Sequence, residues 1–121
     1  QGRKDGSLTS AMFERPYGIT ADKNGNLYVT EARGIRKIDI KSKTTRTIAG
    51  AYFSGFEEEG PATGASIRLP QGIAVTEDGT IYFVAPTHRA IRRISNGVLS
   101  NFIFGSFSTL CSLVLDTKGN I

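Results

Sequence analysis

The stretch RPYGITADKNGNLYVTE (15–31) decides the fold, because the chain repeats it. LPQGIAVTEDGTIYFVA (69–85) is a second copy, and CSLVLDTKGNI (111–121) begins a third. Each copy is a short apolar run followed by a polar turn that contains glycine. Glycine supplies the positive φ that tight hairpin turns need, so this pattern is typical of a β-hairpin. The sequence therefore predicts hairpins related by an internal repeat.

The likeness continues beyond each hairpin. GIRKIDI (34–40) follows the first hairpin and AIRRIS (90–95) the second, and each leads through a polar turn to a fourth short run. The apolar run IYFV (81–84) is nearly continuous, which is typical of strands buried on both faces. Four-stranded antiparallel sheets of this kind, repeated along a chain, are the blades of a β-propeller. We therefore predict an all-β chain that forms part of a β-propeller.

The segments between blades repeat as well. DGSLTSAMFERP (5–16) aligns without gaps on EGPATGASIRLP (59–70), which places Phe13 at the position of Ile67. We expect these two side chains to fill equivalent spaces between neighbouring blades. The predicted division of the chain is a linker (1–17), a blade (18–50), a second linker (51–71), a second blade (72–105) and the start of a next blade (106–121).

The composition is that of a globular domain. Hydrophobic residues make up 39% of the chain and charged residues 21%, and no apolar stretch is long enough to cross a membrane. The net charge of +4 comes from interspersed basic and acidic residues, which argues against nucleic acid as the partner. Cys111 is the single cysteine, so no internal disulfide can form, and its apolar neighbours predict a buried position.

No motif of catalysis is present. The chain has no phosphate-binding glycine loop, no nucleophile elbow and no pair of carboxylates at catalytic spacing. A zinc site needs three or four ligands, whereas this chain has one histidine and one cysteine. We therefore predict no metal and no cofactor, and we expect His88 to be a solvated loop residue.

Basic residues recur on the third strand of each blade, at Arg36, Lys37, Arg92 and Arg93. We interpret them as exposed residues that alternate with isoleucines and whose aliphatic stems pack between blades. The alternative is a basic stripe for RNA, which would need stacking aromatic side chains beside the charges.

The candidate binding residues follow from the topology of a propeller. The linker that leads into each blade and the loop between its second and third strands lie on one face, where ligands commonly bind. On this chain that face would carry Leu69 and the binding candidates Arg15, Tyr17, Glu31, Arg33, Gln71, Thr87, His88 and Arg89.

The two long copies resemble NHL repeats. Both begin with Pro-x-Gly followed by an apolar run, both have a glycine turn before an apolar run with tyrosine at its second position, and both have Arg in the third strand. The resemblance extends over about residues 13–121. It implies a six-bladed ring, completed by further blades from the same longer chain or from another copy. The outer faces are then built for neighbouring blades, and we expect an incomplete ring to expose Ile19, Val29, Val75 and Phe83 or their companions on the opposite side of the strands.

The resemblance also allows the possible functions to be ranked. The first expectation is a non-catalytic binding scaffold that presents loops to a protein, peptide or glycan at an extracellular, cell-surface or periplasmic location. The alternative is part of a propeller hydrolase or lyase, similar to lactonases or to the amidating lyase, with a metal on the central axis. A weaker alternative is RNA binding by a basic face.

Overall fold

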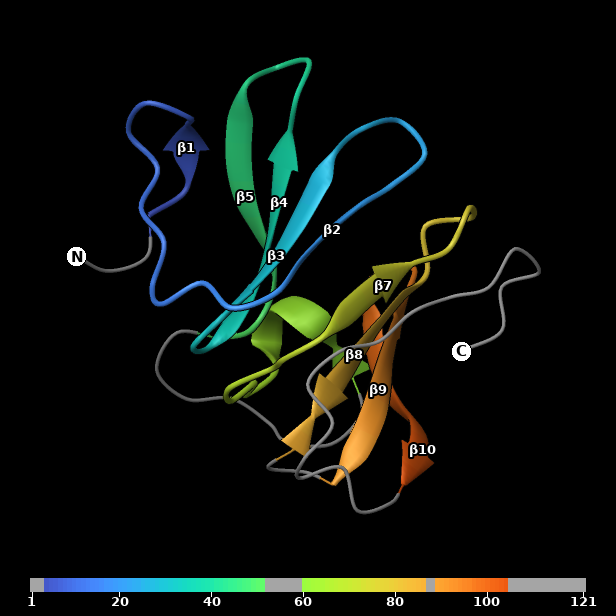
Figure 1. Cartoon of the computed structure of the whole chain (residues 1–121). Helices are drawn as coiled ribbons and strands as arrows, with labels where there is room; N and C mark the ends of the chain where they lie inside the picture. The colour runs from blue at the N-terminus through green and yellow to red at the C-terminus, as the bar shows by residue number, and fades with distance from the viewer. Residues whose placement is uncertain (1–3, 52–59, 87–88, 105–121) are drawn as a thin grey trace.

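The computed structural model describes residues 4–51, 60–86 and 89–104, which form two antiparallel sheets (Figure 1). The first sheet has the order β1-β5-β4-β3-β2, and its strands are β1 (Gly6–Ser7), β2 (Ile19–Ala21), β3 (Leu27–Glu31), β4 (Gly34–Asp39) and β5 (Thr44–Ala49). The second has the order β6-β10-β9-β8-β7, with β6 (Gly60–Pro61), β7 (Ile73–Val75), β8 (Ile81–Ala85), β9 (Ala90–Ser95) and β10 (Val98–Phe104). The all-β prediction is confirmed, and the predicted third copy (106–121) and Cys111 lie outside the described residues.

Each sheet has five strands rather than the predicted four. The fifth strand comes from the linker before the blade: Gly6 of β1 pairs with Thr45 of β5, and Gly60 of β6 pairs with Leu99 of β10. A two-residue strand of this kind covers the outer edge of the blade and pairs backbone groups that would otherwise be open to another chain. The sequences Gly-Ser and Gly-Pro carry no β-propensity, so the local pattern predicts no strand there.

The hydrophobic core lies between the two sheets. Tyr28, Ile35 and Ala49 of the first sheet pack with residues of the second sheet, including Phe83 and Leu99. The innermost strands β2 and β7 are neighbours, and a short 3-10 turn, η1 (Ala62–Gly64), lies close to β5 (Figure 1). One core therefore joins two consecutive repeats into a single unit.

The linker residues Phe13 and Ile67 are not equally buried. Ile67 is 3% exposed and belongs to the core between the sheets, as predicted. Phe13 is only partly buried, so the prediction of equivalent burial is wrong for this residue. The difference arises because Phe13 lies beside Arg36, on the face of the first sheet turned away from the second, where the Arg36 guanidinium carbon lies 4.6 Å from the centre of its ring.

Of the four residues named for the exposed outer faces, only Ile19 is exposed, while on the opposite side Phe102, which packs against Tyr82, is 41% exposed. Ile19 is 64% exposed, whereas Val29 is 6% and Phe83 0% exposed, and Val75 is partly buried. Phe83 faces the first sheet and is therefore in the core. Val29 is the cross-strand partner of Arg36, the residue to which the linker is hydrogen-bonded, so this part of the outer face is covered by the chain itself.

Candidate functional site

Two lead-in segments, residues 15–17 and 69–71, bring the chain into β2 and β7 with the same backbone geometry. Arg15 has φ of 49° and Leu69 has φ of 48°, and each precedes a proline. A positive φ is uncommon for residues other than glycine, and a following proline restricts the backbone further. Tyr17 N–H donates to the Thr30 carbonyl at 2.7 Å, as Gln71 N–H does to the Val84 carbonyl at 2.9 Å. The same strained turn is therefore held at the same place in both repeats.

The two lead-in segments are fastened to each other through the first blade. Thr30 Oγ1 accepts a hydrogen bond from Gly18 N–H at 2.8 Å and donates to the Gln71 carbonyl at 3.0 Å. A Cβ on Gly18 would lie 2.9 Å from that same Gln71 oxygen, so only glycine permits this close approach. Leu69 N–H donates to the Ala32 carbonyl at 2.8 Å. The relative position of the two segments is thus fixed by the Thr30 hydroxyl and by a main-chain hydrogen bond.

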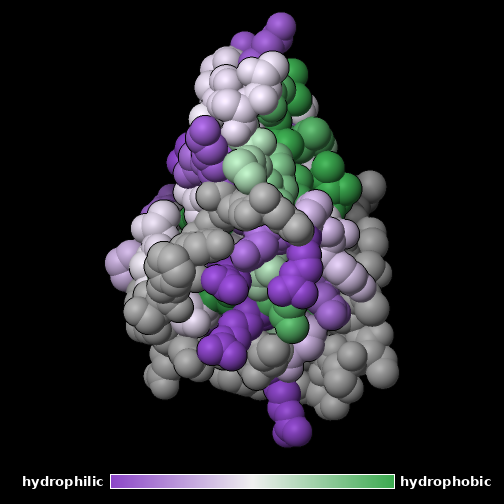
Figure 2. All heavy atoms as spheres, turned by 90° about the vertical axis from the view of Figure 1, so that its left-hand side faces the viewer, coloured by the Kyte–Doolittle hydropathy of each residue, from purple (hydrophilic) through white to green (hydrophobic). Residues whose placement is uncertain are grey.

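A pocket of about 250 Å³ opens between the lead-in segments, lined by Arg15, Pro16, Tyr17, Glu31, Ala32, Leu69, Pro70 and Gln71. Tyr17 is 60% and Leu69 55% exposed, and both line this pocket. Exposed large apolar side chains gathered at one pocket are typical of a ligand or partner site. In Figure 1 the β3–β4 turn and the segment leading into β7 lie on the left. Figure 2 views that side and shows hydrophilic residues gathered around a hollow with hydrophobic surface inside.

Glu31 lines this pocket, but its carboxylate is already engaged inside the protein. The side chain is 1% exposed. Its Oε2 accepts a hydrogen bond from Glu14 N–H at 2.9 Å and lies 3.2 Å from Arg36 Nη1. Glu31 therefore supports the wall of the pocket and ties the linker to β3, and it offers little to a ligand.

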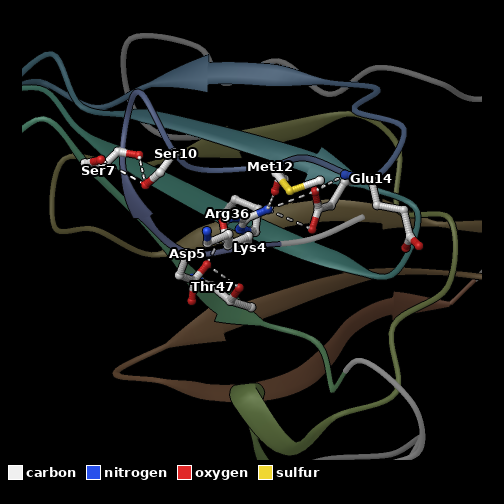
Figure 3. A network of polar contacts seen from close by, with 9 residues as sticks. Lys4, Asp5, Ser7, Ser10, Met12, Glu14, Arg36 and Thr47 are labelled. Carbon is white, nitrogen blue, oxygen red and sulfur yellow. Dashed lines mark hydrogen bonds and ion pairs between the residues drawn. The ribbon is translucent and has the colours of Figure 1, made fainter. Parts of the chain in front are cut away.

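Arg36 is the centre of the polar network to which Glu31 belongs (Figure 3). Its Nη1 donates to the Met12 carbonyl and its Nη2 to the Lys4 carbonyl, both at 2.7 Å. Nη2 also lies 2.9 Å from Asp5 Oδ1. The planar guanidinium has five N–H donors in a fixed fork, which lets one side chain hold two carbonyls and two carboxylates at once.

This network corrects the interpretation of the basic third-strand residues. Arg36 and Arg92 are both 0% exposed, so they are not exposed partners of the isoleucines. The linker covers the Arg36 side chain, and a buried arginine becomes tolerable where backbone carbonyls and a carboxylate meet its charge. A stripe for RNA through these two residues is excluded by their burial.

Two further candidates that the structure describes, Arg33 and Arg89, do not line the pocket. Arg33 is exposed, and its Nε lies 3.7 Å from Glu14 Oε1. Arg89 is exposed, with φ of 51°, and its N–H donates to the Pro86 carbonyl. Thr87 and His88 lie outside the described residues. Of the candidates, the pocket thus brings together Arg15, Tyr17, Glu31 and Gln71.

Pro16, Ala32 and Pro70 complete the lining of the pocket and were not expected there. The proline that precedes the Gly of both repeats was a visible signal for two of them. Within residues 4–51, 60–86 and 89–104, no three His, Cys, Asp or Glu side chains are placed to hold a metal ion. In the same ranges, no helix is long and apolar enough to cross a membrane.

Comparison with known proteins places these observations in a family. No family model matches the chain. NHL repeat-containing protein 2 is 45% identical over 65 residues in Gallus gallus and 42% identical in Homo sapiens, covering 52% of this chain. Protein SUPPRESSOR OF QUENCHING 1, chloroplastic, of Arabidopsis thaliana is 33% identical over 94 residues, or 76% of this chain. The chain spans only 9% of the length of each of these relatives.

Solved structures agree on the architecture. A structural genomics protein of unknown function from Bacteroides thetaiotaomicron matches 75% of this chain and 24% of its own, with a TM-score of 0.68 and 29% identity. Virginiamycin B lyase from Staphylococcus aureus matches 96% of this chain and 36% of its own, with a TM-score of 0.61; at 18% identity it shows the fold alone. With its repeats, its two blade-like sheets and these relatives, the chain belongs to the NHL-repeat β-propeller family.

Proposed function

We propose that the chain is part of a non-catalytic binding scaffold that holds a peptide segment of another protein on the face formed by its lead-in segments. The observation that carries this proposal is the apolar pocket between them, with Tyr17 and Leu69 exposed at its mouth. Tyrosine is enriched among the residues that contribute most to protein recognition, and ligand pockets are lined mainly by apolar and aromatic side chains.

The chemistry of the lining favours a peptide over a glycan. Pro16, Pro70, Ala32 and Leu69 are apolar, and the polar side chains Arg15 and Gln71 stand among them. An apolar side chain of the ligand would enter between Tyr17 and Leu69, and Arg15 and Gln71 would contact its main chain. A glycan would need several convergent hydrogen-bonding groups in place of this apolar lining.

The geometry of the lead-in segments supports the same proposal. Prolines and the left-handed residues before them restrict the backbone on both sides of the pocket. A preformed site loses less conformational entropy when its ligand binds. The restricted backbone of the lead-in segments would therefore raise the affinity of this shallow apolar pocket for a peptide. The likeness to virginiamycin B lyase concerns the fold and supports no catalytic role for these residues.

Peptide selection tests the proposal. Peptides selected from a random library on the full chain are expected to bind at least about tenfold more weakly to the Tyr17→Ala and Leu69→Ala variants, as anchor residues do. Leu8→Ala is the matched control, because Leu8 is 41% exposed and does not line the pocket. Selected peptides that bind both pocket variants as tightly as the unchanged chain would refute the proposal.

A further inference from the structure

A second and larger depression, of about 680 Å³, lies between the two sheets and shares no residue with the pocket described above. Its first wall consists of Tyr28, Lys37, Arg46 and Ile48. The rest of the lining is Thr63 in the middle of η1, Asp78 to Ile81 where the β7–β8 turn enters β8, and Ile94 to Gly97 where β9 leads into the turn before β10. We call this depression the inter-sheet groove. Its volume is that of a site for a small molecule.

Two positive charges stand side by side on the first wall. Lys37 of β4 and Arg46 of β5 are cross-strand partners, so their side chains leave the sheet on the same face. Lys37 Nζ lies 5.6 Å from the centre of the Tyr28 ring. Like charges placed directly opposite each other destabilise a sheet. Within the described residues neither side chain has an ion-pair partner within 4.0 Å, so a bound anion would relieve this repulsion.

Three acidic residues lie near these charges. Asp39 is two positions from Lys37 on β4 and interacts with its charge, although it forms no ion pair within 4.0 Å and its Oδ1 accepts a hydrogen bond from Ser42 N–H. Asp78 lines the groove, where its Oδ1 accepts hydrogen bonds from the Thr76 hydroxyl and from Thr80 N–H. Asp22 accepts hydrogen bonds from Asn26 N–H at 3.0 Å and from the Tyr28 hydroxyl at 3.1 Å. Asp78 and Asp22 shape the two hairpin turns, and none of the three carboxylates forms a close ion pair with Lys37 or Arg46 within the described residues.

The remaining lining suits a ligand that carries hydroxyl groups. Thr63, Thr80 and Ser95 supply hydroxyls and Asn96 an amide, while Tyr28 and three isoleucines supply apolar surface. We propose that the inter-sheet groove binds a small hydroxyl-bearing anion, a sugar carboxylate or sugar phosphate, with its charged group between Lys37 and Arg46. The arginine fork holds two oxygens of a carboxylate or phosphate, and the lysine adds a point charge.

Ligand-observed saturation-transfer NMR on the full chain tests this proposal. The method can be used whether the chain is a monomer or forms larger assemblies. Glucuronate and glucose 6-phosphate are the probes, and they distinguish the two sources of negative charge; neutral glucose is the control ligand. Both Lys37→Gln and Arg46→Gln are expected to weaken binding of at least one anionic probe by about fivefold or more. Lys41→Gln removes the same charge from an exposed residue that does not line the groove, and is expected to leave binding unchanged.

Two further variants separate binding from folding. Arg46→Glu places a carboxylate opposite Lys37, so it is expected to raise the unfolding midpoint while it abolishes anion binding. Asp78→Asn removes the negative charge from the groove and is expected to tighten binding. The proposal is overturned if glucose binds as well as the anions, if Lys41→Gln weakens binding as much as Lys37→Gln, or if neither anion binds.

Discussion

Replacement of Arg36 by methionine tests the central structural claim, that one buried arginine fastens the linker to the first blade. Methionine keeps much of the length and apolar volume of the arginine stem and removes only the guanidinium. The change leaves the carbonyls of Lys4 and Met12 without their donor and the Glu31 carboxylate, 1% exposed, without its cation.

The expected loss follows from burial. Removal of one partner from a buried ion pair costs about 3–5 kcal/mol, because the other charge is left uncompensated. Asp5 adds little to this figure, since its side chain is 48% exposed and such pairs contribute about 0–1 kcal/mol. The two carbonyls can be hydrated again as the linker lifts. We therefore expect Arg36→Met to lower the free energy of unfolding by about 3–5 kcal/mol.

Urea denaturation followed by circular dichroism measures this loss, at several protein concentrations so that association is recognised. Hydrogen exchange of the Leu8 and Met12 amides, both hydrogen-bonded in the linker region, is expected to accelerate. The exposed Lys23→Met is the control and should change stability by less than about 0.5 kcal/mol. Adding Glu31→Leu to Arg36→Met should restore most of the loss, because the unpaired charge is then gone. A single variant as stable as the unchanged chain, or a double variant no better than the single, would refute the reasoning.

Three further predictions concern packing and titration. Ile67→Ala removes a side chain that is 3% exposed and should cost about 2–5 kcal/mol, whereas Phe13→Ala should cost less because Phe13 is only partly buried; equal losses in denaturation would contradict this. Gly50→Ala should cost at least about 3 kcal/mol, since Gly50 has φ of 101° and a Cβ would lie 2.2 Å from a backbone oxygen of the β3–β4 turn; a stable, fully expressed variant would show that the turn can move. Burial, together with the hydrogen bond to Asp22 and its charge, raises the pKa of Tyr28 to about 12. The folded state then holds this proton more tightly than the unfolded state, so this contribution to stability is complete below about pH 10 and is lost as the pH rises toward 12. Phenolate absorbance should show a late titration that Tyr28→Phe removes.

Local chemistry made the hairpins predictable. Gly25 and Gly79 have φ of 87° and 90°, the conformation that the turns of the repeated motif require. Apolar runs on both sides then place β2 and β3, and β7 and β8, close to where the structure has them. The two outermost strands were not predictable, because a two-residue strand has no periodicity and is made by pairing with residues about 40 positions away.

The candidate site was predictable in location and less so in chemistry. Arg15, Tyr17 and Gln71 meet at one pocket because lead-in segments share one face of consecutive blades. The interactions that bury the Glu31 carboxylate could not be predicted from the sequence. They depend on Arg36 in the next strand and on a linker that passes over both residues. Alternation of arginine with isoleucine normally indicates a solvent face, and here that face is covered by backbone carbonyls.

The structural repeat is better described as a linker together with the blade that follows it. In the first unit, β1 pairs with β5 of the same sheet, Arg36 holds the linker, and the chain then enters β2. In the second, β6 pairs with β10, Ile67 is buried in the core, and Arg92 is buried at the position of Arg36. Each unit therefore contributes one lead-in segment, and the pocket lies between two of them. A single unit would carry only half of this pocket, so the proposed peptide binding at this face requires the stacking of consecutive repeats.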